Sequence, residues 1–333
     1  MLSTVAKLLV APGKGILAAD ESSGTIGKKL TGVGVESTEE NRRAYRQLLF
    51  TSAGVEQYIS GVILYDETIR QSDDHGKPFP QLLSDRGIVP GIKVDLGTKK
   101  MDNSPEETIT QGLDGLDARL KEYYNLGARF AKWRAVIKIT DTLPTAECVK
   151  INTTDLARYA KLCQDNNIVP IVEPEVLMTG NHSVERAYQV TAQVLKSLFV
   201  ELKNANVDLS GLLLKPNMVS TGLDNPALAP AEVARQTLAC FREAVPAAVA
   251  GIVFLSGGLT EQAACENLSA INQSKGNAPW PLSFSFGRAL QNSAVKTWAG
   301  KAENVAAAQE AFIKRARLSS AAVRGEYSVE MEG

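Results

Sequence analysis

The 333-residue chain has only two histidines, His75 and His182, and both lie in polar, loop-like surroundings. A catalytic zinc site needs about three protein ligands, and these are usually rich in histidine. The scarcity of histidine therefore disfavours zinc-dependent catalysis, and it also disfavours a Ser–His or Cys–His nucleophile. We expect neither a metal nor another cofactor.

Cysteine is scarce as well, and the few cysteines are scattered along the chain. They are Cys148, Cys163, Cys240 and Cys265. No two of them have the CxxC spacing of zinc ribbons and redox sites. Isolated thiols are more typical of a reducing compartment than of a disulfide scaffold, and we interpret them as small buried hydrophobic residues.

The sequence also lacks an excess of charge and long apolar segments. Its formal net charge is -1, which gives no electrostatic basis for binding nucleic acid or an anionic membrane. No apolar stretch approaches the ~18 residues of a membrane span. The apolar run at the start of the chain contains Lys7 and is too short for a signal peptide. We expect a cytoplasmic protein, with a plastid form that has lost its transit peptide as the alternative.

Eight short apolar segments typical of β-strands alternate with helical patterns over a single domain, 1–333, that ends in a short tail, 328–333. The predicted strands are Gly15–Asp20, Gly61–Tyr65, Gly91–Asp95, Arg129–Val136, Ile168–Glu175, Gly211–Asn217, Gly251–Ser256 and Leu282–Gly287. The predicted helices are Thr38–Thr51, Leu113–Leu126, Thr154–Asp165, Ser183–Asn204, Ala231–Ala244, Glu261–Asn272, Ala289–Trp298 and Asn304–Ser319.

This alternation indicates parallel strands joined by crossover helices. Eight repeats with mostly apolar strands favour a closed (β/α)8 barrel over an open sheet. An open dinucleotide-binding sheet would need GxGxxG after its first strand, and the segment Asp20–Gly24 does not match. Surface loops are expected at Asp73–Pro80, Thr140–Ala146 and Ser220–Pro230.

Polar and charged residues interrupt the apolar strands mainly at their carboxyl ends, where barrel active sites lie. They are Asp20, Lys93, Lys132, Arg134, Glu173, Glu175, Lys215, Ser256 and Arg288. Residues two apart on a strand share a face, so Lys132 pairs with Arg134 and Glu173 with Glu175. A structural ion-pair network inside the barrel is the alternative to an active site, but charges at one end only favour the site.

Lys215 is the strongest candidate nucleophile, because it follows three leucines and precedes Pro216. Desolvation disfavours its ammonium form, and a nearby cation such as Lys132 would act in the same direction. Local sequence does not separate it decisively from Lys132 and Lys93. Glu173 and Glu175 form a candidate acid–base pair for the proton transfers of imine chemistry.

Two places suit phosphate groups. Ser256, Gly257 and Gly258 after the seventh strand, with Gly287 and Arg288 after the eighth, offer backbone N–H groups, a hydroxyl and a guanidinium. A second anion site is predicted just past the first strand, with Lys93 reaching in; its other members are Ser22, Thr25 and Lys29.

These segments resemble class I fructose-1,6-bisphosphate aldolases. The resemblance runs from about Gly13 to Tyr327 through GILAADES, TEENRRAYRQLLF, GIKVD, FAKWR, IVPIVEPE, LLLKPNMV, FLSGG and FGRAL, in family order. It implies a barrel lyase of glycolysis and gluconeogenesis that needs no metal and forms a homotetramer. The reaction would be the reversible cleavage of fructose 1,6-bisphosphate to dihydroxyacetone phosphate and glyceraldehyde 3-phosphate.

The resemblance also implies roles for matching residues. Lys215 would form the Schiff base with the C2 ketone, and Glu173 would be the general acid–base. Asp20 and Lys132 would flank the reacting carbons, while Glu175 and Arg134 orient this set. The ketone-half phosphate would be held by Ser256, Gly258 and Arg288. The aldehyde-half phosphate would lie toward Ser22, Thr25, Lys29 and Lys93.

The sequence departs from the family pattern in places. Thr25, Lys29 and Phe286 stand where Ser, Arg and Tyr are common, and lysine lacks the guanidinium fork. The sequence has no terminal tyrosine of the kind that assists proton exchange at C3, and Tyr327 matches an earlier family tyrosine. We therefore expect slow protonation of the enamine unless another group donates the proton. Rapid exchange of the C3 proton of dihydroxyacetone phosphate would contradict this.

Two alternative functions remain. Another Schiff-base barrel enzyme, such as a transaldolase or a deoxy-sugar-phosphate aldolase, would need only one phosphate site, whereas this chain offers two. A barrel that only binds a ligand is disfavoured by the complete set of Asp20, Lys132, Glu173 and Lys215. The sequence leaves open the additional use of fructose 1-phosphate or a seven-carbon bisphosphate.

Overall fold

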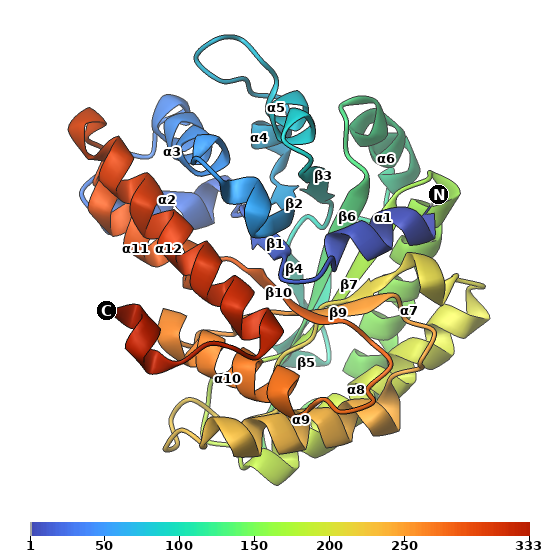
Figure 1. Cartoon of the computed structure of the whole chain (residues 1–333). Helices are drawn as coiled ribbons and strands as arrows, with labels where there is room; N and C mark the ends of the chain where they lie inside the picture. The colour runs from blue at the N-terminus through green and yellow to red at the C-terminus, as the bar shows by residue number, and fades with distance from the viewer. Residues whose placement is uncertain (1) are drawn as a thin grey trace.

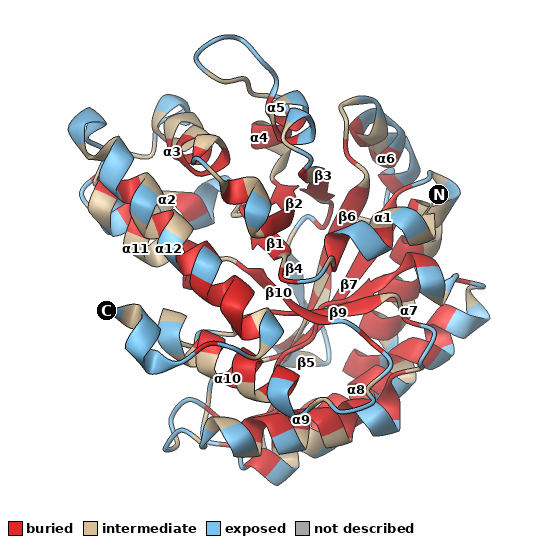
Figure 2. Cartoon of the chain, viewed as in Figure 1, coloured by how far each residue is buried: buried red, intermediate tan, exposed pale blue. Residues whose placement is uncertain are grey.

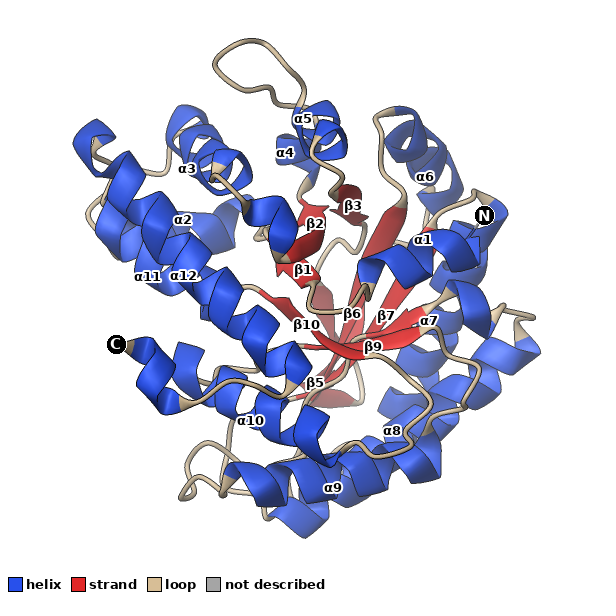
Figure 3. Ribbon diagram, in the orientation of Figure 1, coloured by secondary structure: helices blue, strands red, loops and turns tan. Residues whose placement is uncertain are grey.

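A computed structural model describes residues 2–333 and contains a closed barrel of eight parallel strands ringed by helices (Figures 1 and 3). The order around the barrel is β1-β10-β9-β8-β7-β6-β3-β2. The strands are β1 (Gly15–Ala18), β2 (Ile59–Leu64), β3 (Val89–Lys93), β6 (Phe130–Ile137), β7 (Val169–Val176), β8 (Leu213–Leu214), β9 (Gly251–Phe254) and β10 (Leu282–Phe286). The predicted (β/α)8 barrel is confirmed, and each predicted segment overlaps one of these strands.

The helices surround the sheet and turn their polar faces outward (Figure 2). They are α1 (Leu2–Leu9), α2 (Ser23–Thr31), α3 (Glu39–Thr51), α4 (Asp66–Ile69), α5 (Phe79–Asp85), α6 (Leu116–Asn125), α7 (Ala146–Asp165), α8 (Val184–Asn204), α9 (Pro230–Ala244), α10 (Glu261–Ser274), α11 (Arg288–Trp298) and α12 (Val305–Arg324). Several begin after a hydroxyl side chain that accepts a backbone N–H of the first turn, each worth about 1 kcal/mol. These caps are Thr38, Thr145, Ser183 and Thr260.

The amino-terminal half of the barrel interior is filled by apolar side chains, and the largest of them is the ring of Phe130. Phe130 on β6 is fully buried, and a Cβ atom on Gly91 would lie only 2.3 Å from its ring. A Cβ atom on Gly61 of β2 would lie 3.1 Å from the same ring. Because the two glycines leave room for this ring, the amino-terminal half of the barrel is closed. The carboxyl end is left to polar side chains.

Some elements differ from the sequence prediction. Helix α7 begins at Ala146 rather than Thr154, since Thr145 caps it and is held in turn by the carboxylate of Glu107. The prediction also missed α1, α2, the short helices α4 and α5, and an antiparallel hairpin beside β6. The hairpin strands are β4 (Thr98–Met101) and β5 (Ser104–Thr110). These elements are short or polar, so they carry little periodic signal.

One predicted loop and the predicted tail contain short helices. Helix α5 starts inside the predicted loop Asp73–Pro80, and the tail forms the 3-10 helix η4 (Val329–Glu332). The carboxylate of Glu332 binds the guanidinium of Arg315 on α12 at 2.5 Å. The four cysteines are buried and free. Within residues 2–333, none of the helices has the length and apolar character needed to cross a membrane.

Candidate active site

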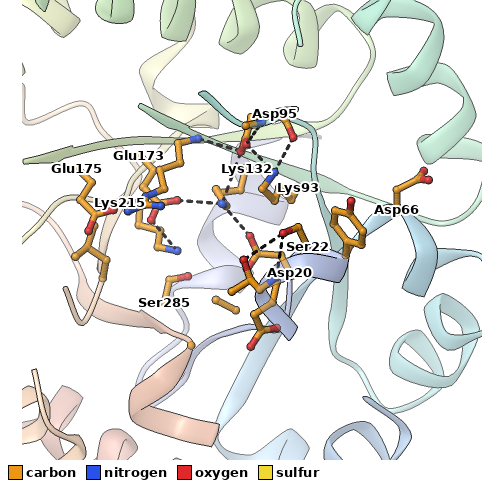
Figure 4. A pocket seen from close by; sticks show the side chains of 18 of the residues that line it. Asp20, Ser22, Asp66, Lys93, Asp95, Lys132, Glu173, Glu175, Lys215 and Ser285 are labelled. Atoms are coloured by element: carbon orange, nitrogen blue, oxygen red, sulfur yellow. Dashed lines mark hydrogen bonds and ion pairs between the residues drawn. The ribbon is translucent and has the colours of Figure 1, made fainter. Parts of the chain in front are cut away.

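The carboxyl ends of the barrel strands surround a cavity of about 1110 Å³ (Figure 4). All predicted site residues except Gly258 line it: Asp20, Ser22, Thr25, Lys29, Lys93, Lys132, Arg134, Glu173, Glu175, Lys215, Ser256, Gly257, Gly287 and Arg288. Gly258 is exposed and lies beside the guanidinium of Arg288. The predicted residues are thus brought together at one end of the barrel.

Lys132 on β6 lies at the centre of the charged groups. Its Nζ atom is 2.8 Å from Oδ2 of Asp20, 3.3 Å from Oε2 of Glu173 and 3.8 Å from Oδ2 of Asp95. Its side chain is only 5% exposed. Burial by itself lowers the pKa of Lys132, but the carboxylates of Asp20, Glu173 and Asp95 outweigh burial and raise it. Lys132 is therefore a permanent cation.

Asp20, two residues past β1, is the anion of this centre. Burial by itself raises the pKa of Asp20, but the positive charges of Lys132, Lys215 and Lys93 outweigh burial and hold it below the ordinary value. An ionised carboxylate can accept a hydrogen bond or a proton, but it has no proton to give. Asp20 therefore suits the role of a fixed negative charge or a base.

Lys215 follows the short strand β8, and its backbone N–H donates to the carbonyl of Val172 on β7 at 2.8 Å. The buried leucines Leu213 and Leu214 precede it. Its Nζ atom lies 3.1 Å from Oε1 of Glu173, and both side chains are 5% exposed. An amine in such dry surroundings, within proton-transfer distance of a carboxyl group, can act as a nucleophile.

Glu173 and Glu175 occupy β7, and both are buried. The two carboxylates have different partners: Glu173 lies between Lys215 and Lys132, whereas Glu175 binds Nε of Arg134. The strand register pairs Lys132 with Ile171 and Arg134 with Glu173, so each cation of β6 reaches the acid two residues further along β7. Arg134 neutralises Glu175 and leaves Glu173 as the carboxylate nearest the amine.

One wall of the cavity is suited to an anion. Helix α11 begins at Arg288, so its first N–H groups have no helical partner and point toward the cavity. Among residues 2–333, no carboxylate pairs with Arg288. Ser256 is buried nearby, and Gly257 has a φ of 57°, where a Cβ would also meet the sulfur of Met178 at 2.5 Å. The backbone here can approach a ligand as only glycine allows.

The neighbouring wall, past β1, carries a second helix start, but its cations are already paired. Ser22 caps α2, and its hydroxyl lies 3.1 Å from that of Thr25. Lys29 binds the carboxylate of Glu21 and donates to Oε1 of Gln291 at 3.0 Å. Lys93 lies 2.6 Å from Oδ1 of Asp95. This end can bind an anion, with less unbalanced positive charge than the wall at Arg288.

Sequence reasoning missed four residues of the site. Asp95 was predicted only as a strand end, although it lies two residues from Lys93 and binds it. Glu21, which lines the cavity, and Gln291, which lies behind its wall, both bind Lys29. Ser285 lines the cavity from β10, and its Oγ atom has no hydrogen-bond partner within the described chain. A polar residue inside the apolar segment LSFSF was the available signal.

No metal centre was predicted. Within residues 2–333 no group of three or more His, Cys, Asp or Glu side chains is arranged to hold a metal ion. The chemical groups at the cavity are an amine, carboxylates and anion-binding groups.

Comparisons with known proteins give a consistent picture. A family model described as "Glycolytic: Fructose-bisphosphate aldolase class-I" matches residues 1–333. A chickpea (Cicer arietinum) protein named "Fructose-bisphosphate aldolase, cytoplasmic isozyme" is 54% identical over 317 residues, covering 95% of this chain and 88% of its own length. A Xanthomonas campestris protein named "Probable fructose-bisphosphate aldolase class 1" is 51% identical, covering 98% of both chains.

A solved structure is similar throughout. It is the fructose-bisphosphate aldolase of Plasmodium falciparum in a ternary complex with TRAP and a small-molecule inhibitor. It superposes with a TM-score of 0.96 at 48% sequence identity, covering 98% of this chain and 95% of that one. The barrel and its loops are therefore similar in arrangement as well as in sequence.

Proposed function

The chain belongs to the class I fructose-bisphosphate aldolase family, and from this premise we propose that Lys215 forms the Schiff base in its reaction. The reaction is the reversible cleavage of fructose 1,6-bisphosphate to dihydroxyacetone phosphate and glyceraldehyde 3-phosphate. The observation that carries the proposal is the 3.1 Å separation of the Lys215 Nζ and Glu173 Oε1 atoms in a buried cavity.

The first stage is formation of the imine. Lys215 in its neutral form attacks the C2 ketone carbon, and a proton passes from its nitrogen to the carbonyl oxygen to give a neutral carbinolamine. Glu173 donates the proton with which the C2 hydroxyl leaves as water, and the nitrogen lone pair forms the C=N bond.

The second stage is cleavage. A carboxylate, Glu173 after its first proton transfer, removes the proton of the C4 hydroxyl. The C4–O electrons form the aldehyde, the C3–C4 bond breaks, and its electron pair moves toward the iminium nitrogen to give an enamine. Lys132 and Asp20 flank this position with fixed opposite charges, which act without reorganisation as charge develops. Protonation at C3 and hydrolysis then release dihydroxyacetone phosphate.

The two anion-binding walls hold the phosphates. In this proposal the ketone-half phosphate lies against Arg288, Ser256 and the start of α11, and the aldehyde-half phosphate against Ser22, Thr25 and Lys93. A bisphosphate held at both ends keeps its reacting carbons beside Lys215, which reduces the entropy cost of reaching the transition state.

Borohydride trapping tests the assignment. Enzyme is mixed with fructose 1,6-bisphosphate, reduced with sodium borohydride, digested and mapped by mass. The expected adduct lies on Lys215 and is absent in Lys215→Met, while Lys93→Met still carries it on Lys215. An adduct on Lys93 or Lys132 in the wild type overturns the assignment.

We further propose a homotetramer in the cytosol. The support is resemblance: several of the plant relatives carry "cytoplasmic" or "cytosolic" in their names. The outward face of α8 also exposes Val200, an apolar side chain that a subunit contact would cover. Analytical ultracentrifugation at several concentrations tests the assembly. A single monomeric species at every concentration would contradict it.

A further inference from the structure

Gln291 on α11 is fully buried, and both polar atoms of its side chain have partners. Its Nε2 atom donates to the carbonyl oxygen of Ala18, the last residue of β1, at 2.7 Å. Its Oε1 atom accepts from Nζ of Lys29 at 3.0 Å and from the hydroxyl of Tyr45 at 3.1 Å. The carbonyl of Ala18 fixes the orientation of the amide, because an oxygen in place of Nε2 would meet another acceptor. These partners therefore require a side chain that both donates and accepts.

Lys29 is the partner that lines the active-site cavity, with 12% of its side chain exposed. An ammonium group has three N–H donors. One of them binds the carboxylate of Glu21 and another binds Oε1 of Gln291. The third has no acceptor among residues 2–333, so it is available to a ligand in the cavity.

The charges around Lys29 do not balance. The carboxylate of Glu21 also binds Arg46, at 2.9 Å, and the side chain of Arg46 is only 2% exposed. Burial by itself raises the pKa of Glu21, but Lys29 and Arg46 outweigh burial and lower it, so Glu21 is ionised. Two cations thus share one carboxylate, and one positive charge is left over. Because Gln291 is neutral, it holds Lys29 without cancelling this charge, which favours an anion.

Gln291 also connects the two walls of the cavity. It lies one turn after Arg288 on α11, while its amide binds the end of the strand that precedes Asp20. Arg46 fixes the next carbonyl, that of Ala19, at 3.0 Å. The segment between β1 and α2 is therefore held from α11 and from α3 at the same time.

We propose that Gln291 is a positioning residue that sets the preference for a substrate with two phosphates. Its oxygen fixes the ammonium of Lys29 so that the free N–H faces the aldehyde-half phosphate, and its neutrality leaves the surplus positive charge to that phosphate. A glutamate would fit the same space but would balance the charges, with two cations against two carboxylates. The inference rests on the proposed function and adds the residue that keeps Lys29 available to the second phosphate.

Gln291→Glu tests the proposal, with kcat and KM measured at pH 8 for fructose 1,6-bisphosphate and fructose 1-phosphate. We expect KM for the bisphosphate to rise about tenfold, since the added negative charge repels the phosphate at this wall. KM for fructose 1-phosphate should rise much less, because that substrate has no phosphate there. The matched control is Gln57→Glu, which adds the same charge at an exposed position outside the cavity and should leave both KM values as in the wild type.

Exchange of the two acceptors separates this role from simple packing. The double variant Glu21→Gln/Gln291→Glu again places one carboxylate and one amide on Lys29. Its KM for the bisphosphate should be about threefold or more below that of Gln291→Glu, the coupling expected between residues that share a partner. Gln291→Met removes the hydrogen bonds without adding a charge, and it should also raise KM more for the bisphosphate than for fructose 1-phosphate.

Circular dichroism shows which variants are folded, and Gln291→Met serves if Gln291→Glu is not. Equal increases in KM for the two substrates overturn the proposal, because a purely structural glutamine would affect both alike. An exchange variant no better than Gln291→Glu overturns it too. Borohydride trapping of wild type on Lys215 with fructose 1-phosphate does not depend on this wall, so a failure of the proposed function would be seen separately.

Discussion

The Nζ atom of Lys215 lies 3.1 Å from one carboxylate oxygen of Glu173, while the other oxygen of Glu173 has no hydrogen-bond donor in the described chain. Lys132 is 3.3 Å from that second oxygen but is not aligned to donate to it. One oxygen of this carboxylate thus contacts the amine, while the other has no donor of its own and lies near the charge of Lys132. This geometry suits a group that acts first as an acid and then as a base.

Replacing Glu173 with Gln should therefore affect the proton transfers more than substrate binding. We expect kcat to fall by about 10²–10⁴-fold, the usual contribution of a general acid–base group, with KM little changed. Borohydride trapping should also slow, because loss of water from the carbinolamine lacks its acid. Steady-state kinetics and timed trapping measure both effects.

The matched control is Glu175→Gln, since Glu175 binds Arg134 and lies away from the amine. A smaller loss of kcat is expected there, with no delay in trapping. If Glu173→Gln raised KM while leaving kcat unchanged, Glu173 would be a binding residue rather than the acid–base group.

Removing the charge of Lys132 should destabilise the whole barrel. Lys132→Met would leave the carboxylates of Asp20, Glu173 and Asp95 facing one another with less positive charge among them. Breaking a buried ion pair by deleting one partner costs about 3–5 kcal/mol. Urea unfolding at fixed protein concentration measures the change.

A double-mutant cycle provides the control for this loss. Asp20→Asn in the Lys132→Met background removes a carboxylate that has become unpaired. The double variant should therefore lose less unfolding free energy than the sum of the losses of the two single variants. Strict additivity would show that Asp20 and Lys132 are not coupled, contrary to their 2.8 Å separation.

Stability at acid pH should depend on Asp20. Burial by itself raises the pKa of Asp20, but Lys132, Lys215 and Lys93 hold it below its ordinary value of 3.8 in the folded chain. The unfolded chain therefore binds more protons as the pH falls, so the contribution of Asp20 is present above pH 3.8 and is lost toward the folded pKa.

Asp20→Asn should accordingly flatten the acid side of the stability profile. Between about pH 5 and pH 3, the wild type should lose more unfolding free energy than the variant. Urea titrations at several pH values measure the two slopes. The same slope in both proteins would mean that the folded pKa of Asp20 is not lowered.

Much of the barrel and of the charged centre is predictable from sequence, for a physical reason. A charge inside an apolar strand, such as Lys132, Glu173 or Lys215, is costly unless it has a partner or a ligand, so its position alone marks a site. The eight strands are equally visible, because a buried parallel strand is apolar on both faces. The barrel then brings the marked residues to one end.

The pairings within the site are not predictable in the same way. Lys29 looks like a free cation in the sequence, but the fold places Gln291 and Glu21 on it. Gln291 is 262 residues away along the chain, and no periodic pattern connects the two. Ser285 is hidden for a related reason, because a serine in a buried strand normally bonds a nearby carbonyl. Only the packed barrel reveals that its hydroxyl has no such partner.

The unequal charge of the two cavity walls leads to a last prediction. Arg288 has no carboxylate partner in the described chain, whereas Lys29 is paired with Glu21, a carboxylate that also binds Arg46. If the ketone-half phosphate binds at Arg288, Arg288→Ala should lower kcat/KM for both fructose 1,6-bisphosphate and fructose 1-phosphate. The expected loss is about 10–100-fold, the value of a hydrogen bond to a charged group.

Lys29→Met should discriminate between the same two substrates, because only the bisphosphate has a phosphate at that end. We expect a loss of no more than about fivefold with fructose 1,6-bisphosphate, as for a partly exposed ion pair, and none with fructose 1-phosphate. Arg288→Lys is the conservative control and should recover part of the activity, since it keeps the charge and loses the fork. Equal losses in Lys29→Met for both substrates would place Lys29 outside the second phosphate site, and the site would then rest on Lys93, Ser22 and Thr25.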